Sequence, residues 1–146
     1  MAKRTATVAW KGALLSGAGM IESSGSGALG KLPITWLARA DVSDGKTSPE
    51  ELIAAAHASC FAMALSALLA ESGTPPEQLD VKATVTFVPG TGITMSELEL
   101  GGRVSGLSED AFRAKAEQAK ANCPVSQALK GLEITLSVTS FEPAAA

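Results

Sequence analysis

Two cysteines and a few charged or polar residues are the groups in this sequence that could do chemistry. Cys60 lies in the middle of a long apolar stretch, and Cys123 directly precedes Pro124. Two thiols can reduce an oxidant when one attacks it as a thiolate and the second resolves the product. A cysteine on an apolar helix is more often a small core residue, so a redox role needs an activating group nearby.

Arg39 is the obvious cation for such a pair. It closes the otherwise apolar segment LPITWLARA, where a charge is costly unless it is paired. Glu50 could pair with it. The alternative for Arg39 is the end of a strand, with the side chain pointing into solvent.

His57 lies three residues before Cys60, on the same face of a helix. It could be a base or a metal ligand, but we favour a core histidine that hydrogen-bonds to the backbone. A zinc site made of His57, Cys60 and Cys123 would lack the paired Cys-x-x-Cys spacing that is typical of such sites.

The sequence predicts a long helix over residues 48–70 that carries Cys60. Ser48 is a good N-cap, Pro49 suits the first helical position, and Glu51 completes a capping box. No charged residue occurs from Leu52 to Ala70, so this helix should be buried on nearly every side, in a protein or in a membrane. The many alanines, and the lack of closely flanking Lys or Arg, favour a cover made by a sheet or by a second copy of the helix.

A second helix is predicted over residues 108–122. Ser108 caps it, and Phe112, Ala116, Ala119 and Cys123 share one face. If the two helices pack together, the two sulfurs can meet. Because Cys123 precedes a new helical turn at Pro124, N–H groups there should lower the pKa of a nearby sulfur.

Alternating segments predict strands within residues 5–40, within residues 81–104 and over residues 132–141. The third N-terminal strand should span Leu32–Ala40, and a slip in the apolar pattern suggests a bulge near Glu97. The order of elements indicates one α+β domain over residues 1–146, with an antiparallel sheet.

Composition narrows the class of protein. The chain has 146 residues, 46% hydrophobic and 18% charged, enough for a core, and its net charge of −3 argues against a nucleic-acid binder. The N-terminus lacks the apolar core of a signal peptide, so we expect a cytoplasmic protein without a structural disulfide framework.

The segments TSPEELIAAAHASCFAMALS and AKANCPVSQALKG resemble the OsmC/Ohr family of thiol-dependent peroxidases. The residues Pro-Glu-Glu-Leu-Ile and Cys-Pro-Val-Ser-Gln look more like its OsmC branch. The resemblance implies an α+β fold and an intertwined homodimer, in which antiparallel sheets wrap around two long central helices.

By the same resemblance, the activity would be reduction of organic hydroperoxides in oxidative or osmotic stress. Cys60 matches the peroxidatic thiol, Cys123 the resolving thiol, and Arg39 with Glu50 the activating pair. The cycle implied is a sulfenic acid on Cys60, then a Cys60–Cys123 disulfide that an external dithiol, of the lipoyl type, reduces. No prosthetic cofactor, metal, nucleic acid or membrane is implied.

Candidates for the wall of the peroxide pocket are Phe61, Met63 and Ile53. Two alternatives from other classes remain: a thiol redox sensor or binding module without turnover, and a stress-induced structural protein with inert thiols.

Overall fold

The computed structural model describes residues 1–143 and divides into two compact units, Met1–Leu52 and a second from Ile53 onward. The elements confirm an α+β fold. In chain order they are β1 (Ala6–Lys11), β2 (Ala18–Ser24), β3 (Leu32–Ile34), α1 (Trp36–Ala40), α2 (Pro49–Glu71), β4 (Gln78–Val88), β5 (Gly92–Arg103), α3 (Glu109–Asn122), α4 (Pro124–Ala128) and β6 (Glu133–Glu142).

The first unit is a small antiparallel sheet in the order β1-β2-β3, followed by α1. Every residue of β1 is exposed, including Val8 and Trp10. Ile21 and Ala38 are its buried hydrophobic residues. The unit by itself therefore leaves much apolar sheet surface uncovered.

The predicted third strand is wrong beyond Ile34. Trp36–Ala40 forms the short helix α1, and the Thr35 hydroxyl caps it by accepting a hydrogen bond from the Ala38 N–H at 3.1 Å. The run Trp-Leu-Ala-Arg-Ala lacks β-branched residues and is rich in good helix formers, which explains the difference. Arg39 consequently lies in the last turn of a helix.

Helix α2 begins as the sequence predicts. The Ser48 hydroxyl accepts a hydrogen bond from the Glu51 N–H at 3.1 Å. The Glu51 carboxylate accepts another from the Thr47 hydroxyl at 2.8 Å, which ties the preceding loop to the first turn. The helix ends at Glu71, one residue later than expected.

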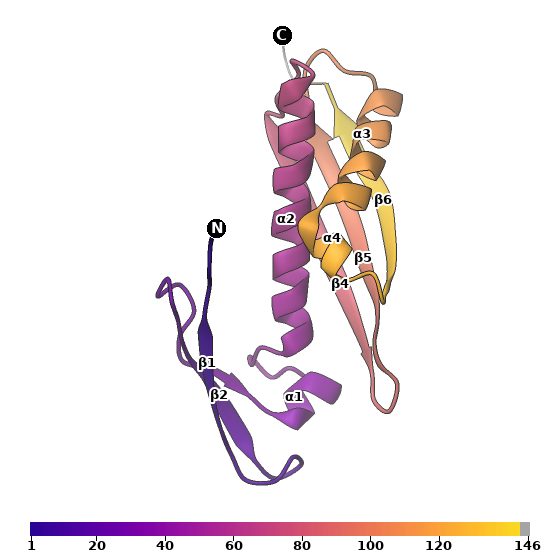
Figure 1. Ribbon diagram of the computed structural model, residues 1–146. Coiled ribbons are helices and arrows are strands. Elements are labelled where there is room, and N and C mark those ends of the chain that lie inside the picture. Colours follow the sequence, from indigo (N-terminus) through magenta and orange to yellow (C-terminus); the bar gives the residue numbers. More distant parts are fainter. Residues whose placement is uncertain (144–146) are drawn as a thin grey trace. The chain divides into compact units, whose positions relative to one another are not determined.

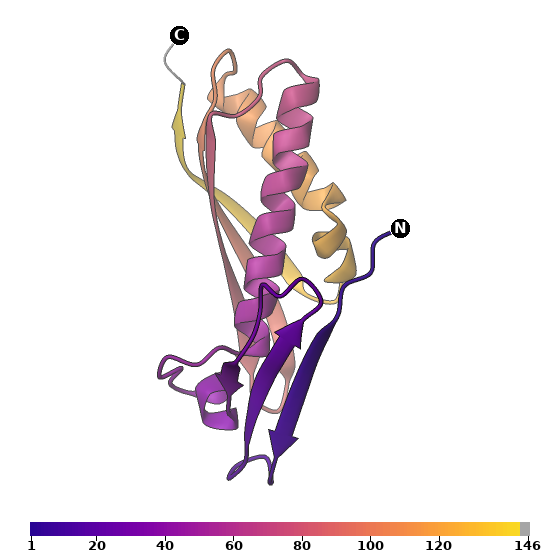
Figure 2. The same ribbon diagram turned by 90° about the vertical axis from the view of Figure 1, so that its left-hand side faces the viewer.

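The second unit is one sheet in the order β4-β5-β6, with α2, α3 and α4 packed on one of its faces (Figures 1 and 2). Strands β4 and β5 are antiparallel, but β5 and β6 are parallel. The sheet is therefore mixed rather than purely antiparallel. The reason is that α3 and α4 carry the chain back across the sheet, so that β6 starts at the same end as β5.

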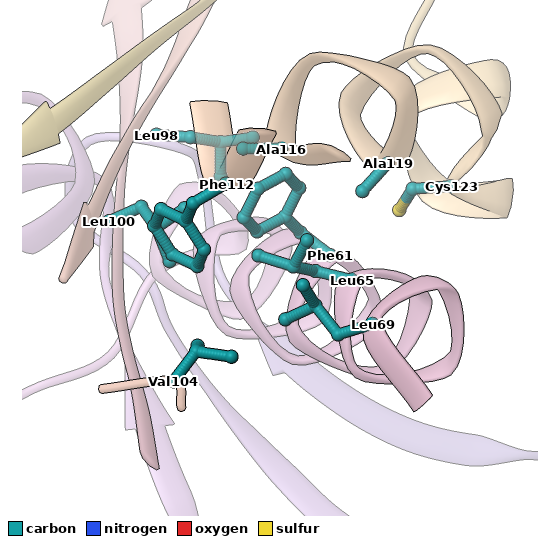
Figure 3. Packing of buried hydrophobic residues seen from close by; sticks show 10 residues of the cluster. All are labelled: Phe61, Leu65, Leu69, Leu98, Leu100, Val104, Phe112, Ala116, Ala119 and Cys123. Carbon is teal, nitrogen blue, oxygen red and sulfur yellow. The ribbon is translucent and has the colours of Figure 1, made fainter. Parts of the chain in front are cut away.

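The core of this unit lies between the sheet and the helices (Figure 3). Its fully buried residues are Phe61, Leu65, Leu69, Leu98, Leu100, Val104, Phe112, Ala116, Ala119 and Cys123. Strands β4 and β6 and helix α4 pack partly buried residues against this cluster. On the other face of the sheet, Lys82, Thr84 and Glu97 are exposed. The layer of helices thus covers one side of the sheet only.

The bulge predicted near Glu97 lies elsewhere. Glu97 pairs regularly with Thr84, whereas the register shifts where Thr86 pairs with Met95 and Phe87 with Ile93. The extra residue is Thr94. The error arose because the inner face of β5 begins with Ser96, a polar residue that is fully buried.

In the described part of one chain, helix α2 is buried along one face, and its expected cover by a second copy of the helix stays a prediction. His57, Phe61, Leu65 and Leu69 recur every fourth residue and are fully buried. The opposite face is exposed, and Met63 on it keeps 72% of its surface accessible. A single sheet covers only one side of a helix, so the sheet of the second unit leaves this apolar face open. By length and composition, α2 also meets the requirements of a membrane span.

The approach of α3 to β5 requires glycine at position 102. A Cβ built there would lie 2.8 Å from Cε2 of Phe112. That ring is held against Phe141, with ring centroids 5.0 Å apart. The helix could therefore not move aside without disturbing the core.

We predict that Gly102→Ala lowers the free energy of unfolding by about 1–3 kcal/mol, because it overpacks the core. Gly131→Ala is the matched control, since no atom lies within 4 Å of its Cβ position, and it should change stability by less than about 0.5 kcal/mol. Urea unfolding followed by circular dichroism measures both. Equal stability of the two variants would contradict this packing.

Candidate active site

The two thiols meet in the second unit. Cys60 lies on α2, Cys123 lies between α3 and α4, and both are free cysteines whose side chains hydrogen-bond to each other. Cys123 is fully buried at the margin of the core beside Ala119 (Figure 3), whereas Cys60 is half-buried. The packing of two helices thus places both sulfurs in one site, as the shared apolar faces led us to expect.

The surroundings of Cys123 favour its thiolate. Burial alone would raise the pKa of this thiol, but hydrogen bonding from the Ser126 N–H, Cys60, the Ser126 hydroxyl and the Val125 N–H outweighs it and lowers the pKa. Those N–H groups belong to the first turn of α4. They do not form a regular side-chain cap with Cys123, yet they orient positive dipole ends toward its sulfur.

The surroundings of Cys60 do the opposite. Burial raises the pKa of this thiol, and so do the hydrogen bond and the charge of Cys123, while the Val125 N–H lowers it. The expectation that the N–H groups near Pro124 lower a sulfur pKa therefore holds for Cys123 and only in part for Cys60. A thiolate on Cys60 near neutral pH needs a further positive group.

Arg39 and Glu50 form a tight ion pair within the first unit. Arg39 Nη2 and Nε donate to Glu50 Oε1 at 2.8 and 3.0 Å, and Nε also lies 3.2 Å from Oε2. The Glu50 side chain is 8% exposed and that of Arg39 31%. A buried carboxylate needs such a partner, and the planar fork of arginine is held in one orientation by it.

A small pocket of about 110 Å³ adjoins Arg39. Trp10, Trp36, Leu14 and Pro49 contribute to its mostly apolar wall. Both cysteines of the chain belong to the other unit. The first unit therefore offers a cation beside an apolar pocket but contributes no thiol of its own.

His57 is fully buried, as we favoured, but its partners are not backbone groups. Its Nδ1 lies 2.6 Å from Ser96 Oγ on β5, and its Nε2 lies 2.8 Å from Ser126 Oγ on α4. Both ring nitrogens are thus engaged by hydroxyl groups, which does not suit a zinc ligand. Among residues 1–143, no group of three or more His, Cys, Asp or Glu side chains is arranged to hold a metal.

Sequence reasoning missed Ser96 and Ser126 as members of this site. Ser126 belongs to the Cys-Pro-Val-Ser-Gln run, and Ser96 falls on the inner face of β5, two residues before Leu98. A single polar residue at a core position of a strand needs a buried partner. A polar residue at that position, together with the single histidine of the chain, predicts a contact between Ser96 and His57.

Of the suggested pocket residues, Phe61 is fully buried in the core. Met63 is largely exposed and Ile53 is half-buried. Their place in the wall of a peroxide pocket stays a prediction.

Comparison with known proteins agrees with this geometry. The family model described as OsmC-like protein matches residues 42–137. The chain belongs to the OsmC family. It is 42% identical over 130 residues to the peroxiredoxin OsmC of Escherichia coli, with 87% of this chain and 89% of that protein covered.

Solved structures of the OsmC family share the fold. The organic hydroperoxide resistance protein OhrB of Bacillus subtilis superposes with a TM-score of 0.67 at 24% identity, over 92% of this chain and 98% of that one. An organic hydroperoxide resistance protein OsmC from Legionella pneumophila gives a TM-score of 0.63 at 24% identity, over 92% and 96%.

Burial of His57 makes the stability of this OsmC-family chain depend on pH. Burial lowers the pKa of His57 below its ordinary value of 6.5. Below that pH the unfolded chain takes up a proton that the folded chain resists, so stability is full above 6.5 and declines as the pH falls toward the folded pKa.

We predict that the free energy of unfolding decreases by up to about 1.4 kcal/mol per pH unit below about pH 6.5. Urea unfolding between about pH 7 and about pH 5.5 measures the slope. The His57→Gln variant lacks this proton and should show a flatter profile. The same slope in both proteins would mean that His57 does not carry the effect.

Proposed function

We propose that this protein is a cytoplasmic thiol-dependent peroxidase that reduces organic hydroperoxides and so protects against oxidative or osmotic stress. The observation that carries the proposal is the pair of hydrogen-bonded free thiols, Cys60 and Cys123, in a chain of the OsmC family. The apolar residues that pack beside Cys60 favour a substrate with an apolar tail.

Cys60 is the attacking thiol in this proposal. Cys60 is half-buried, whereas Cys123 is fully buried, and a peroxide must reach the residue that attacks it. The Cys60 thiolate attacks one oxygen of the O–O bond, which breaks, and a sulfenic acid remains on Cys60. The departing alkoxide takes up the proton that Cys60 released on ionisation and leaves as the alcohol. Cys123 then attacks that sulfur, the disulfide forms and water leaves. An external dithiol of the lipoyl type reduces the disulfide and completes the cycle.

Arg39 supplies the positive charge that Cys60 lacks in its own unit. Because burial and Cys123 raise the pKa of Cys60, a guanidinium near its sulfur is needed to hold the thiolate at neutral pH. Glu50 fixes the orientation of that guanidinium through the ion pair. The apolar pocket beside Arg39 receives the organic tail of the peroxide.

A second copy of the chain covers the exposed apolar surfaces. The uncovered face of α2 and the exposed strand β1 are both too apolar to remain in water. We infer a homodimer in which both units of each chain form one OsmC-like domain. Each site is composite, so that Arg39 and Glu50 of one chain serve Cys60 of the other.

Axial distance along α2 supports this composite site. Glu50 and Cys60 are ten residues apart on the helix, which corresponds to about 15 Å along its axis. A glutamate side chain does not cover that distance to its own Cys60. Where two copies of α2 cross antiparallel, the start of one helix lies near the middle of the other.

One prediction of the proposed function separates the roles of the two thiols. Cys60→Ser should abolish consumption of an organic hydroperoxide, whereas Cys123→Ser should consume one equivalent and stop as a sulfenic acid that dimedone traps. Stopped-flow assays measure peroxide consumption by the wild type and the two serine variants. The peroxides are cumene hydroperoxide and hydrogen peroxide, each with dihydrolipoamide or thioredoxin as reductant.

The organic peroxide should react faster than hydrogen peroxide, and dihydrolipoamide should sustain turnover. The reverse behaviour of the two serine variants would overturn the assignment of the thiols. Oxidation of the wild type without turnover by any dithiol would refute the peroxidase and favour a redox sensor.

The second prediction tests the composite site. Cys60→Ser and Arg39→Ala chains, each inactive, are unfolded together and refolded. A random mixture should recover about a quarter of wild-type activity, because half the dimers are mixed and each of these unites one intact Cys60 with one intact Arg39.

The matched control mixes Cys60→Ser with Cys123→Ser chains. The two sulfurs of one site belong to one chain, so steady-state activity should not return in this mixture. Recovery in the control, or none in the test mixture, would contradict the composite site.

A further inference from the structure

A continuous chain of buried polar groups ends at the Cys123 sulfur. It runs from Ser96 Oγ to His57 Nδ1 at 2.6 Å, from His57 Nε2 to Ser126 Oγ at 2.8 Å, and from the Ser126 hydroxyl to Cys123. Ser96 and His57 are fully buried, and Ser126 is 4% exposed. The proposed roles of Cys60, Cys123, Arg39 and Glu50 make no use of these three residues.

Packing alone does not explain why Ser96, His57 and Ser126 form this hydrogen-bonded series. Apolar side chains of similar size would fill the same space without the cost of burying an imidazole and two hydroxyls. The three residues come from α2, β5 and α4 and satisfy one another inside an otherwise apolar core. A polar chain of this kind directed at a reactive sulfur calls for a chemical reason.

The hydrogen bonds of this series can point in two alternative directions. In the first, Ser96 donates to Nδ1, the Nε2–H of His57 donates to Ser126 Oγ, and the Ser126 hydroxyl donates to the Cys123 sulfur. In the second, the Ser126 hydroxyl donates to Nε2, and Nδ1–H donates to Ser96 Oγ. Ser126 Oγ is then an acceptor toward Cys123. The two arrangements differ in the tautomer of one neutral imidazole.

We propose that His57 and Ser126 are positioning residues for the resolving thiol. They present a hydroxyl proton to Cys123 while its sulfur carries negative charge, and withdraw that proton once the charge is gone. The inference rests on the proposed function only in calling Cys123 the resolving thiol. The hydrogen-bond chain itself belongs to the reduced protein.

The proton of Cys123 does not stay on His57. Burial lowers the pKa of His57, so the imidazole stays neutral. It changes its tautomer instead of storing a proton. In the resolving step the S–O bond of the Cys60 sulfenic acid breaks and the S–S bond forms. Cys123 attacks as a thiolate, and the departing hydroxide takes up the proton that Cys123 released on ionisation and becomes water. Because a disulfide sulfur is a weak acceptor, the chain then adopts its second arrangement.

Nitrogen-15 NMR can observe this switch directly, because the chain contains one histidine. The Cys60→Ser variant, in which Cys123 is the only thiol, is labelled at the imidazole and titrated. Ultraviolet absorbance of the thiolate follows Cys123 in parallel. We expect the tautomer with the proton on Nε2 to increase with the same midpoint as the Cys123 thiolate. A tautomer ratio that stays constant through that titration would overturn the proposal.

Substitution of Ser126 gives a second, independent readout. In the same background, Ser126→Ala should slow alkylation of Cys123 by iodoacetamide about tenfold at a fixed pH below the thiol pKa, since the thiolate loses a hydrogen bond. It should also uncouple the His57 tautomer from the titration. Ser126→Thr keeps the hydroxyl and should restore both.

Val104→Ala is the matched control, because it removes packing from the same core without touching the chain of polar groups. It should leave alkylation and tautomer unchanged relative to its parent. A slowing equal to that of Ser126→Ala would show that loosened packing, and not the hydroxyl, is responsible, and would refute the proposal. Neither readout uses a peroxide, so failure of the peroxidase assay would be a separate result.

Discussion

The contact between the Cys60 and Cys123 sulfurs depends on how closely α2 packs against the sheet and against α3. Disulfide formation requires Cβ atoms about 3.5–4.5 Å apart, which leaves little room for movement of either helix. Small residues on α3, Ala116 and Ala119, are fully buried and allow close approach. Pro124 then ends α3 and starts α4, which leaves Cys123 at the junction with helical N–H groups directed toward it.

A polar contact fixes the same packing from another side. His57 joins α2 to β5 through Ser96 and to α4 through Ser126. A slip of one residue in β5 would turn Ser96 to the outer face of the sheet and leave a buried imidazole nitrogen without a partner. The contact therefore constrains strand register and helix position together, and these are the two variables that decide where the thiols lie.

The proposed site divides its chemistry between the two units of the chain. The second unit contains both sulfurs but raises the pKa of Cys60, while the first contains the Arg39–Glu50 pair and an apolar pocket. In such an arrangement Cys60 remains a weakly nucleophilic thiol until the cation is supplied. In the proposed homodimer, assembly of the site would therefore control the reactivity of Cys60.

Local sequence signals by themselves determined the two long helices, α2 and α3, and the chemical groups of this protein. Ser48 and Ser108 mark helix starts through hydrogen bonds to their own first turns, and the spacing of Phe112 and Cys123 places them on one face. Tertiary structure alone decided the parallel pairing of β6 and the Ser96–His57–Ser126 contact. These features depend on groups far apart in the chain, whose partners and burial are fixed only when the elements pack.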